Sequence, residues 1–312
     1  MLIDSAFMLP EKPVRLIMDI KQLKFLIALD ETRHFGQAAE RCYVTQPTLS
    51  MRLRSLEEEL GLELVRRGQR FEGFTEAGQR ILAWARTLMA AHEGLYAEAA
   101  AYKGQLVGTL RLGIVPLASY DPMPLLHHLR QLHSNLRFQL SVLSTEHILE
   151  QLASNQLDLG ISYLSHLNDQ MFESQSLTET RMGLLFDQRH FQFDEQELSW
   201  ERVADLPLGL LTGGMHFRQS VDHGFRSRGL TPRPVLESDA VHLLLQAVNA
   251  GLCCAVMPLK GGFDALTEHS CLLPIQGGRA LAPLGLIIRR TAPRLPVAEA
   301  CFAEARLLYS GK

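Results

Sequence analysis

Between Phe74 and Leu95, apolar residues recur at alternating spacings of three and four positions. Such a repeat keeps the apolar side chains on one face of a helix, which then packs along a seam against another helix. The seam consists of Phe74, Ala77, Ile81, Trp84, Leu88, Ala91 and Leu95. An alternation of this length favours a long helix that pairs with the same helix of a second copy. The alternative is a core helix inside one globular domain.

This helix separates two parts of the 312-residue chain that differ in pattern. Before it, helical periodicity begins at Met18. After Gly104, β and α patterns alternate, which predicts an α/β architecture with a parallel or mixed sheet. The strand candidates are TLRLGIV, FQLSVL, LDLGISY, GLLF, LPLGLLT, LCCAVM and LGLII. Segments 147–161 and 242–256 resemble each other, which favours two related lobes over a chance likeness of helix–strand junctions.

Composition narrows the functional classes. A net charge of −3 gives no global positive field, so a nucleic-acid partner has to meet a local patch. Five cysteines without a CxxC pair, and no apolar run that could form a signal or membrane span, predict a cytoplasmic protein without a membrane partner. Walker, GxSxG and dinucleotide motifs are absent, and His127, His128 and His133 lack metal spacing. We therefore expect no enzyme, cofactor or metal site.

The stretch TQPTLSMRLRSLEEELG, residues 45–61, predicts a helix with opposite ends of different character. Leu49, Leu53, Leu56 and Leu60 form one buried stripe. The outward N-terminal half is uncharged or basic, whereas the C-terminal half carries Glu57, Glu58 and Glu59. This polarity suits a helix whose first two turns enter a DNA groove while its acidic tail stays in solvent. With the helices expected at 19–32 and 36–42 it predicts a helix-turn-helix, and the alternative is a small helical oligomerisation domain.

The expected DNA contacts lie on this helix and on the glycine-rich segment that follows it. Segment 66–74 reads as a hairpin or wing whose arginines reach phosphates or a minor groove. The candidates are Thr45, Gln46, Pro47, Thr48, Ser50, Met51, Arg52, Arg54, Arg66, Arg67 and Arg70. Residues 19–71 contain nine Lys or Arg and eight Asp or Glu, so the signal is the placement of the charges.

From Met18 onward the chain resembles the LysR-type transcriptional regulators. The matching text is HFGQAAERCYVTQPTLSMRLRSLEEELGLELVRR, followed by FTEAGQRIL. The resemblance implies a winged helix-turn-helix, a dimerising linker helix and a two-lobed co-inducer domain that resembles periplasmic binding proteins. It also implies homodimers or homotetramers on an interrupted palindrome in double-stranded promoter DNA. Met51 and Leu64 depart from the family pattern, which has a basic residue and Phe there.

The resemblance and the periodicity together predict the domain boundaries. Residues 1–17 are expected to be a disordered extension, with Met18 as an alternative start. The winged helix-turn-helix covers 18–75, the linker helix 76–105 and the effector domain 106–312. Within the effector domain, lobe I covers 106–180 and 283–312, and lobe II covers 181–282. The chain is expected to cross between the lobes near 178–182 and 278–284.

A small-molecule effector is expected between the lobes, beyond the carboxyl ends of the strands. The hydroxyls of Ser119 and Thr145 could hold a small carboxylate. The alternative is that Thr145 only caps the helix that follows it. The candidates are Pro116, Leu117, Ser119, Thr145, Thr212, Gly213 and Phe217.

The function expected from these patterns is regulation of transcription in response to a small molecule. A regulator that is ligand-independent or redox-responsive is the alternative, because Cys253 and Cys254 are adjacent; they are more simply read as small buried residues. A free solute-binding protein would explain the two lobes but not residues 18–95.

Overall fold

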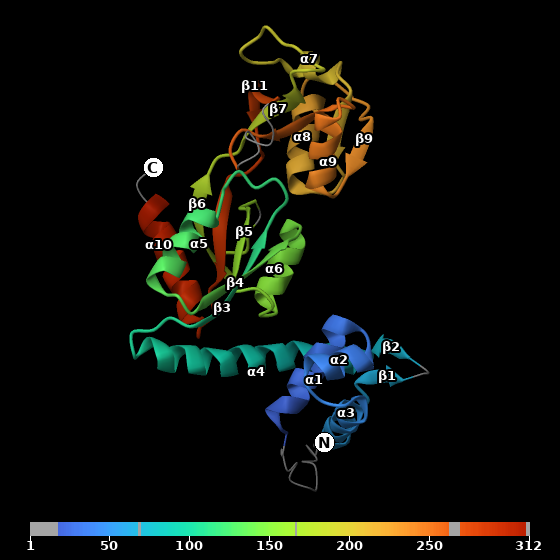
Figure 1. Ribbon diagram of the computed structural model, residues 1–312, viewed down its shortest axis with the longest axis vertical. Coiled ribbons are helices and arrows are strands. Elements are labelled where there is room, and N and C mark those ends of the chain that lie inside the picture. Colours follow the sequence, from blue (N-terminus) through green and yellow to red (C-terminus); the bar gives the residue numbers. More distant parts are fainter. Residues whose placement is uncertain (1–17, 68–69, 166, 262–268, 310–312) are drawn as a thin grey trace, which may run out of the picture. The chain divides into compact units, whose positions relative to one another are not determined.

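The computed structural model describes residues 18–67, 70–165, 167–261 and 269–309 (Figure 1). The chain divides into two compact units, residues 1–92 and 93–312. The predicted extension, residues 1–17, lies outside the described residues.

The first unit is a three-helix core followed by a hairpin. Its helices are α1 (Ile20–Thr32), α2 (Phe35–Arg41) and α3 (Gln46–Leu60), and its strands are β1 (Val65–Arg67) and β2 (Phe71–Phe74). Asp19 caps α1 in a capping box with Gln22, so the helix begins one residue later than the pattern suggested. The leucine stripe of α3 is buried at Leu49, Leu53 and Leu56, whereas Leu60 is only partly buried. The expected helix-turn-helix and wing are therefore present.

The hairpin is tied to the end of α3 through backbone hydrogen bonds. Gly61 ends the helix in the left-handed conformation, with φ 66°. The backbone N–H groups of Leu64 and Val65 then donate to Glu57 Oε1 at 2.9 and 3.0 Å. Glu57 was expected to stay in solvent with its neighbours, and that expectation is wrong. The carboxylate instead anchors the start of the wing, because it accepts from the last residue before β1 and from the first residue of β1.

Helix α4 (Glu76–Ala101) follows the hairpin and runs from the first unit into the second. Its helical residues end four positions before the predicted boundary at 105. Thr75 holds its start, because the Thr75 hydroxyl donates to Glu63 O at 2.6 Å and accepts from Gly78 N at 2.9 Å.

Lobe I of the second unit is built on a five-stranded sheet in the order β4-β3-β5-β12-β6. The strands are β3 (Gly108–Ile114), β4 (Leu136–Val142), β5 (Leu159–Tyr163), β6 (Phe172–Thr178) and β12 (Leu284–Arg289). Strands β3, β4 and β5 are parallel, and β12 is antiparallel to both of its neighbours. Helices α5 (Met123–Leu132) and α10 (Pro296–Tyr309) cover one face, and α6 (Thr145–Ala153) covers the other (Figure 1).

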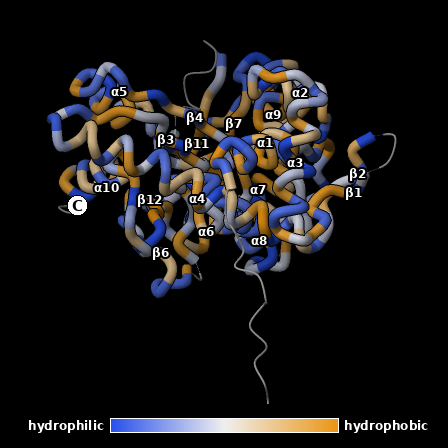
Figure 2. Tube along the Cα trace, turned by 90° about the horizontal axis from the view of Figure 1, so that it is seen from below, coloured by the Kyte–Doolittle hydropathy of each residue, from blue (hydrophilic) through white to orange (hydrophobic). Residues whose placement is uncertain are grey.

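Lobe II has a second five-stranded sheet in the order β11-β7-β10-β8-β9. Its strands are β7 (Arg181–Asp187), β8 (Leu208–Leu211), β9 (Leu236–Ser238), β10 (Cys254–Pro258) and β11 (Ser270–Arg279), with helices α7 (Trp200–Ala204), α8 (His216–Arg226) and α9 (Val241–Asn249). Trp200 locks α7 onto α8, because its ring packs on Phe225 at 4.7 Å and against Gly224. Hydrophobic residues, orange in Figure 2, form one continuous core through both lobes.

The chain passes between the two sheets twice, at the places the sequence predicted. The first crossing joins β6 to β7 and the second joins β11 to β12. Three strands were missed. Strand β6 has only two apolar residues, Phe172 and Leu177, β9 has three residues, and β11 contains a proline and two glycines, which are uncommon in strands.

A glycine in α4 tests how tightly the linker helix packs on the wing. A Cβ added at Gly78 would lie 2.0 Å from the Leu64 carbonyl oxygen, so backbone would have to move. We expect Gly78→Ala to destabilise the first unit by about 1–3 kcal/mol. Thermal unfolding followed by circular dichroism measures this.

The matched control lies in the same helix. At Gly94 an added Cβ would meet only Leu295 Cδ2 at 3.7 Å, an ordinary contact. Gly94→Ala should therefore stabilise the helix by about 0.5–1 kcal/mol. A Gly78→Ala protein that melts at or above the wild-type temperature contradicts this packing.

Candidate DNA-binding and effector-binding sites

The N-terminal half of α3 presents an uncharged and basic surface. Thr45 is the N-cap, and its hydroxyl accepts from Thr48 N at 3.4 Å and bonds the Thr48 hydroxyl at 2.9 Å. Pro47 stands in the first turn, where a missing N–H loses no helical bond. Of the predicted contacts on this helix, Thr45, Gln46, Pro47, Met51, Arg52 and Arg54 are exposed, and Thr48 and Ser50 are half-buried. All eight are therefore within reach of a partner on this side.

The wing adds exposed basic side chains. Arg66 and Arg70 are exposed, whereas the side chain of Arg67 lies outside what the structure describes. In the described parts of the chain, neither Arg66 nor Arg70 forms a hydrogen bond or ion pair with another residue. Their guanidinium groups are thus available for phosphates.

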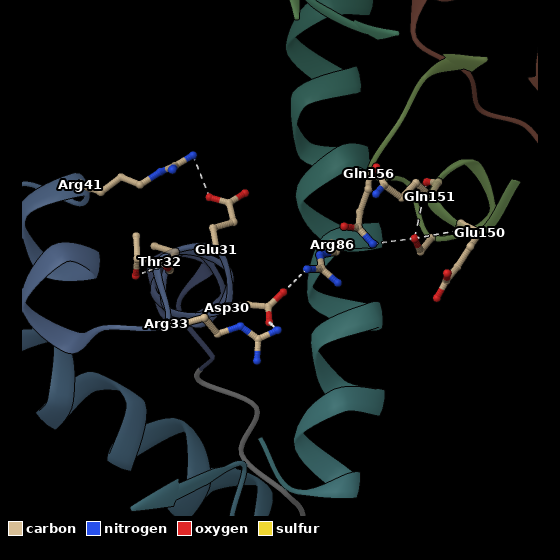
Figure 3. A network of polar contacts seen from close by, with 11 residues as sticks. Asp30, Glu31, Thr32, Arg33, Arg41, Arg86, Glu150, Gln151 and Gln156 are labelled. Atoms are coloured by element: carbon tan, nitrogen blue, oxygen red, sulfur yellow. Dashed lines mark hydrogen bonds and ion pairs between the residues drawn. The ribbon is translucent and has the colours of Figure 1, made fainter. Parts of the chain in front are cut away.

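Sequence reasoning missed the charge network behind the wing. Asp30 lies between Arg33, at 2.8 Å, and Arg86 of α4, as Figure 3 shows. The Arg33 guanidinium also lies over the rings of Phe71 and Phe74, 5.8 and 5.9 Å from their centres. Arg33 has a positive φ of 52° at the end of α1, which aims its side chain at the hairpin. The wing, α1 and α4 are consequently held by one carboxylate and two guanidinium groups.

The predicted seam of α4 is divided between two environments. Phe74 is buried in the core of the first unit, and Ala77 and Ile81 are half-buried, so this end of the seam packs within its own chain. Further along, Trp84, Leu88 and Leu95 are 68%, 45% and 67% exposed. A different stripe, formed by Leu82, Ala85 and Met89, packs on the helix-turn-helix. The exposed part of the seam is an apolar surface of the kind that packs against another protein surface.

The predicted effector hydroxyls of lobe I are buried and bonded. Ser119 is 4% exposed and its hydroxyl bonds that of Thr180 at 2.6 Å. Thr145 is 8% exposed and accepts a hydrogen bond from Ser162 at 2.9 Å. The N-cap of α6 is Ser144, which accepts from His147 N, so the alternative role of Thr145 as the cap is wrong. The physical reason is that the helix begins at Thr145 itself.

The remaining effector candidates differ in their accessibility. Leu117 is buried with a positive φ of 55°, and Pro116 is half-buried. In lobe II, Thr212 is half-buried and Gly213 is exposed, whereas Phe217 is 2% exposed. Of these, Leu117 and Phe217 belong to the common core of the two lobes. A ligand could therefore reach Thr212 and Gly213 more directly than the side chain of Phe217.

The lobes meet through residues that the sequence did not single out. The His216 ring, at the start of α8, stacks on Tyr163 at 4.1 Å and 11°, and its Nε2 bonds the Ser165 hydroxyl at 2.7 Å. Ser220 accepts from Leu281 N at 3.1 Å, at the second crossing. In the sequence, these contacts were signalled only by the position of Tyr163 and Ser165, which stand at and just after the carboxyl end of β5. None of these side chains carries a permanent charge.

Tyr163 is a large, fully buried polar side chain of this region. It is 1% exposed, and its hydroxyl forms no well-aligned hydrogen bond with any residue in the described ranges. The neighbouring Thr180 hydroxyl is committed to Ser119. Burial raises the pKa of Tyr163, and proximity to Thr180 only moderates the rise. The phenol therefore stays protonated and remains a hydrogen-bond donor at neutral pH.

The cysteines offer little to a redox reaction. Cys253 and Cys254 are fully buried, and burial raises the pKa of Cys254 to about 12. Burial likewise raises the pKa of Cys301 to about 12. Cys42 and Cys271 are half-buried, and all five thiols are free. Since the thiolate is the reactive form, the adjacent pair is poorly suited to a switch.

The described parts of the chain show neither a metal site nor a membrane-spanning helix. Among those residues no group of His, Cys, Asp and Glu could hold a metal ion. Within the same residues, no helix has the length and apolar character needed to cross a membrane.

Comparison with known families matches both halves of this architecture. Residues 20–79 match the bacterial regulatory helix-turn-helix protein of the lysR family, and residues 103–307 match the LysR substrate binding domain. The chain belongs to the LysR family. It is a LysR-type transcriptional regulator, with an N-terminal helix-turn-helix and a LysR substrate-binding domain.

Relatives and solved structures agree with this assignment along most of the chain. The RuBisCO operon transcriptional regulator of Allochromatium vinosum is 26% identical over 92% of this chain and 95% of the relative. The hydrogen peroxide-inducible genes activator of Haemophilus influenzae is 30% identical over 75% and 79%. A full-length OxyR variant from Pseudomonas aeruginosa has a TM-score of 0.69 at 25% identity, covering 92% and 97%. CbnR, a LysR family transcriptional regulator, has a TM-score of 0.71 at 22% identity, covering 95% and 100%.

The exposed stripe of α4 leads to a prediction about assembly. Leu88→Glu places a charge in the apolar seam, where burial without a partner is unfavourable. We expect the full-length variant to sediment as a smaller species than the wild type at equal concentration. Analytical ultracentrifugation measures the difference.

Ala83→Glu is the control, because Ala83 is exposed on α4 but stands outside the seam. It introduces the same charge and should leave the sedimentation coefficient unchanged. Equal sedimentation of Leu88→Glu and wild type means that the stripe does not join two copies.

Proposed function

We propose that this LysR-type regulator binds double-stranded promoter DNA through α3 and the wing, as a homodimer or homotetramer, and responds to a small molecule held between its two lobes. The observation that carries the DNA contact is the surface of α3, whose exposed first turns bear Arg52 and Arg54 and no acidic side chain. The DNA partner places the protein in the cytoplasm, and no catalytic role, cofactor or metal is part of the proposal.

The contacts divide into two kinds. Residues from Thr45 to Arg54 enter the major groove, where the free N–H groups and positive dipole at the start of α3 favour phosphate. Arg66, Arg67 and Arg70 of the wing reach the backbone or the neighbouring minor groove. The solved structure of CbnR complexed with its target DNA, which this chain matches with a TM-score of 0.69 at 22% identity, supports a fold able to dock in this way.

The oligomer supplies a second α3 for a second half-site. The exposed apolar residues Trp84, Leu88 and Leu95 on α4 support pairing of two linker helices. A symmetric pair of helix-turn-helix domains binds half-sites separated by a multiple of one helical turn of DNA, about 34 Å.

The effector site is proposed at the edge where the lobes meet, with Ser119, Thr145, Thr212 and Gly213 nearest to the ligand. Ser119 and Thr180 form one hydroxyl pair, and the Tyr163 hydroxyl is a spare donor beside it. This lining has hydroxyl groups and no permanent cation, which supports a small neutral or singly charged effector, with a small carboxylate as candidate. A ligand shifts DNA binding only as far as it prefers one arrangement of the lobes over another.

The test is footprinting on the DNA upstream of the protein's own coding sequence, combined with Arg66→Ala. The wild type should protect two half-sites on one face of the duplex. Arg66→Ala should weaken binding about equally on specific and unrelated DNA, and the slope of log K against log salt should fall by about 0.9.

Arg233→Ala is the matched control, since Arg233 is an exposed arginine of lobe II and its loss changes the net charge equally. It should change neither affinity nor slope. If Arg66→Ala and Arg233→Ala behave alike, the wing does not contact phosphate, and if the wild type protects no DNA the proposed function is wrong.

The redox alternative makes a separate prediction. Because burial raises the pKa of Cys254 to about 12, this thiol is neutral throughout the physiological range, with a thiolate fraction of about one in ten thousand at pH 8. A thiol-specific disulfide reagent at pH 8 should modify only Cys42 and Cys271 in the folded protein, and all five cysteines after unfolding. Peptide mass spectrometry locates the modified sites. Rapid labelling of Cys253 or Cys254 in the folded protein would restore the redox interpretation.

A further inference from the structure

Arg111, Asp158 and Arg289 lie side by side in lobe I, at the end of the sheet opposite to the proposed effector site. Arg111 is in β3, Asp158 directly precedes β5, and Arg289 is in β12. Leu159 of β5 pairs with Leu112 of β3 and with Ile288 of β12. Asp158, one residue before β5, therefore stands between Arg111 and Arg289. The strands β3 and β5 are parallel and begin at this end, whereas their carboxyl ends face the effector site. The charged row is thus a separate place in the lobe.

Arg111 donates three hydrogen bonds to the carboxylate of this row. Arg111 Nε and its backbone N–H donate to Asp158 Oδ2 at 3.1 and 2.8 Å, and Arg111 Nη2 donates to Oδ1 at 2.8 Å. Both partners are shielded, with side chains 23% and 7% exposed. This bidentate geometry is the strongest that a guanidinium and a carboxylate can form. Within the described residues, the hydrogen bonds of this carboxylate come from Arg111 and none comes from Arg289.

Arg289 stands next to Asp158 but forms no ion pair with it in the described residues. Its Nε is buried without a hydrogen-bond partner, and the residue forms no ion pair within the described ranges. Burial lowers the pKa of Arg289, the Asp158 carboxylate raises it, and Arg294 and Arg111 lower it further. The strand register places Arg111 and Arg289 on either side of Asp158, and Arg294 follows five positions after Arg289. A shielded donor of this kind is unfavourable unless something accepts from it.

The next carboxylate along the sheet is also committed. Glu173 of β6 accepts from Arg294 at 2.8 Å and from Arg306 at 3.1 Å. The neighbouring Arg290 donates to the carbonyl oxygens of Asp169 and Phe172. The ion pairs of this region therefore serve Arg111, Arg294 and Arg306, and none of them serves Arg289. The region carries an excess of positive charge around one unmatched guanidinium.

We propose that a small oxyanion binds at Arg289, between Arg111 and Arg294, as a second ligand site of the regulator. A phosphate, sulfate or carboxylate group presents paired oxygens that match the planar fork of a guanidinium. Its charge offsets the repulsion among the arginines, and its oxygens accept hydrogen bonds from the Arg289 guanidinium. The proposal does not depend on the proposed effector site, because no residue is shared between them.

The experiment measures thermal unfolding of the full chain against added phosphate, in buffer whose ionic strength is held constant with chloride. Wild type should show a saturable rise of about 3–6 °C at roughly ten times the dissociation constant. Arg289→Met keeps the length of the side chain and removes the charge, so the saturable rise should disappear. Arg289→Lys retains a charge without the fork and should weaken the midpoint concentration several-fold.

Arg279→Met is the control. Arg279 is 69% exposed on β11, and its ion pair with Glu179 is long, at 3.8 Å, so its loss removes one positive charge and no strong contact. It should keep the full response to phosphate. Parallel titrations with sulfate and acetate separate a tetrahedral anion from a carboxylate: a response to acetate alone assigns a carboxylate ligand. Phosphate also stabilises proteins generally by exclusion from their surface.

An equal, non-saturating rise in wild type, Arg289→Met and Arg279→Met overturns the proposal, and so does the absence of any rise. If Arg289→Met does not fold, the wild-type saturation and the Arg289→Lys midpoint still decide the matter. Failure here leaves the footprint on promoter DNA unaffected.

Discussion

The carboxylate of Asp30 holds together the parts of the DNA-binding unit that have to move as one. It accepts from Arg86 of α4 and from Arg33, and Arg33 covers the two aromatic rings of the wing. Its side chain is only 12% exposed, so the pair is shielded from salt more than a surface ion pair. Removing one partner of a buried pair costs about 3–5 kcal/mol because the other charge is left unpaired. The arrangement of α1, the wing and α4 thus rests on this polar network.

In the second unit the equivalent constraint is the double crossing of the chain. The two sheets share one hydrophobic core, and two short segments, between β6 and β7 and between β11 and β12, join them. Thr180 stands on the first of these segments and bonds Ser119, whereas Ser220 binds the backbone of the second at Leu281. A change in hydrogen bonding at the crossings therefore acts directly on the connection between the lobes. The stack of His216 on Tyr163 adds a contact that lies outside the backbone connections.

Periodicity and capping chemistry predicted the elements whose pattern is strong. Leucine spacing predicted the register of α3 and its cap at Thr45. Apolar runs predicted seven strands of the second unit, namely β3, β4, β5, β7, β8, β10 and β12. Local pattern could not reveal the partners of polar side chains. Glu57 looked like a solvent-facing acid but binds the wing, and Thr145 looked like a cap although Ser144 fulfils that role. The predicted seam was read as one surface, yet Phe74 is the last residue of β2, before α4 begins, and its side chain belongs to the core of the first unit.

The bond between Ser119 and Thr180 has a consequence for sensitivity. An effector that reaches either hydroxyl meets a group already satisfied at 2.6 Å, so binding exchanges one hydrogen bond for another. Such an exchange contributes little net free energy, because a typical intramolecular hydrogen bond is itself worth only about 0.5–1.5 kcal/mol. In the effector site proposed above, affinity would then come from shape, from displaced water and from the unpartnered Tyr163 hydroxyl. The proposed site would therefore select its ligand by shape more than by the strength of its hydrogen bonds to Ser119 and Thr180.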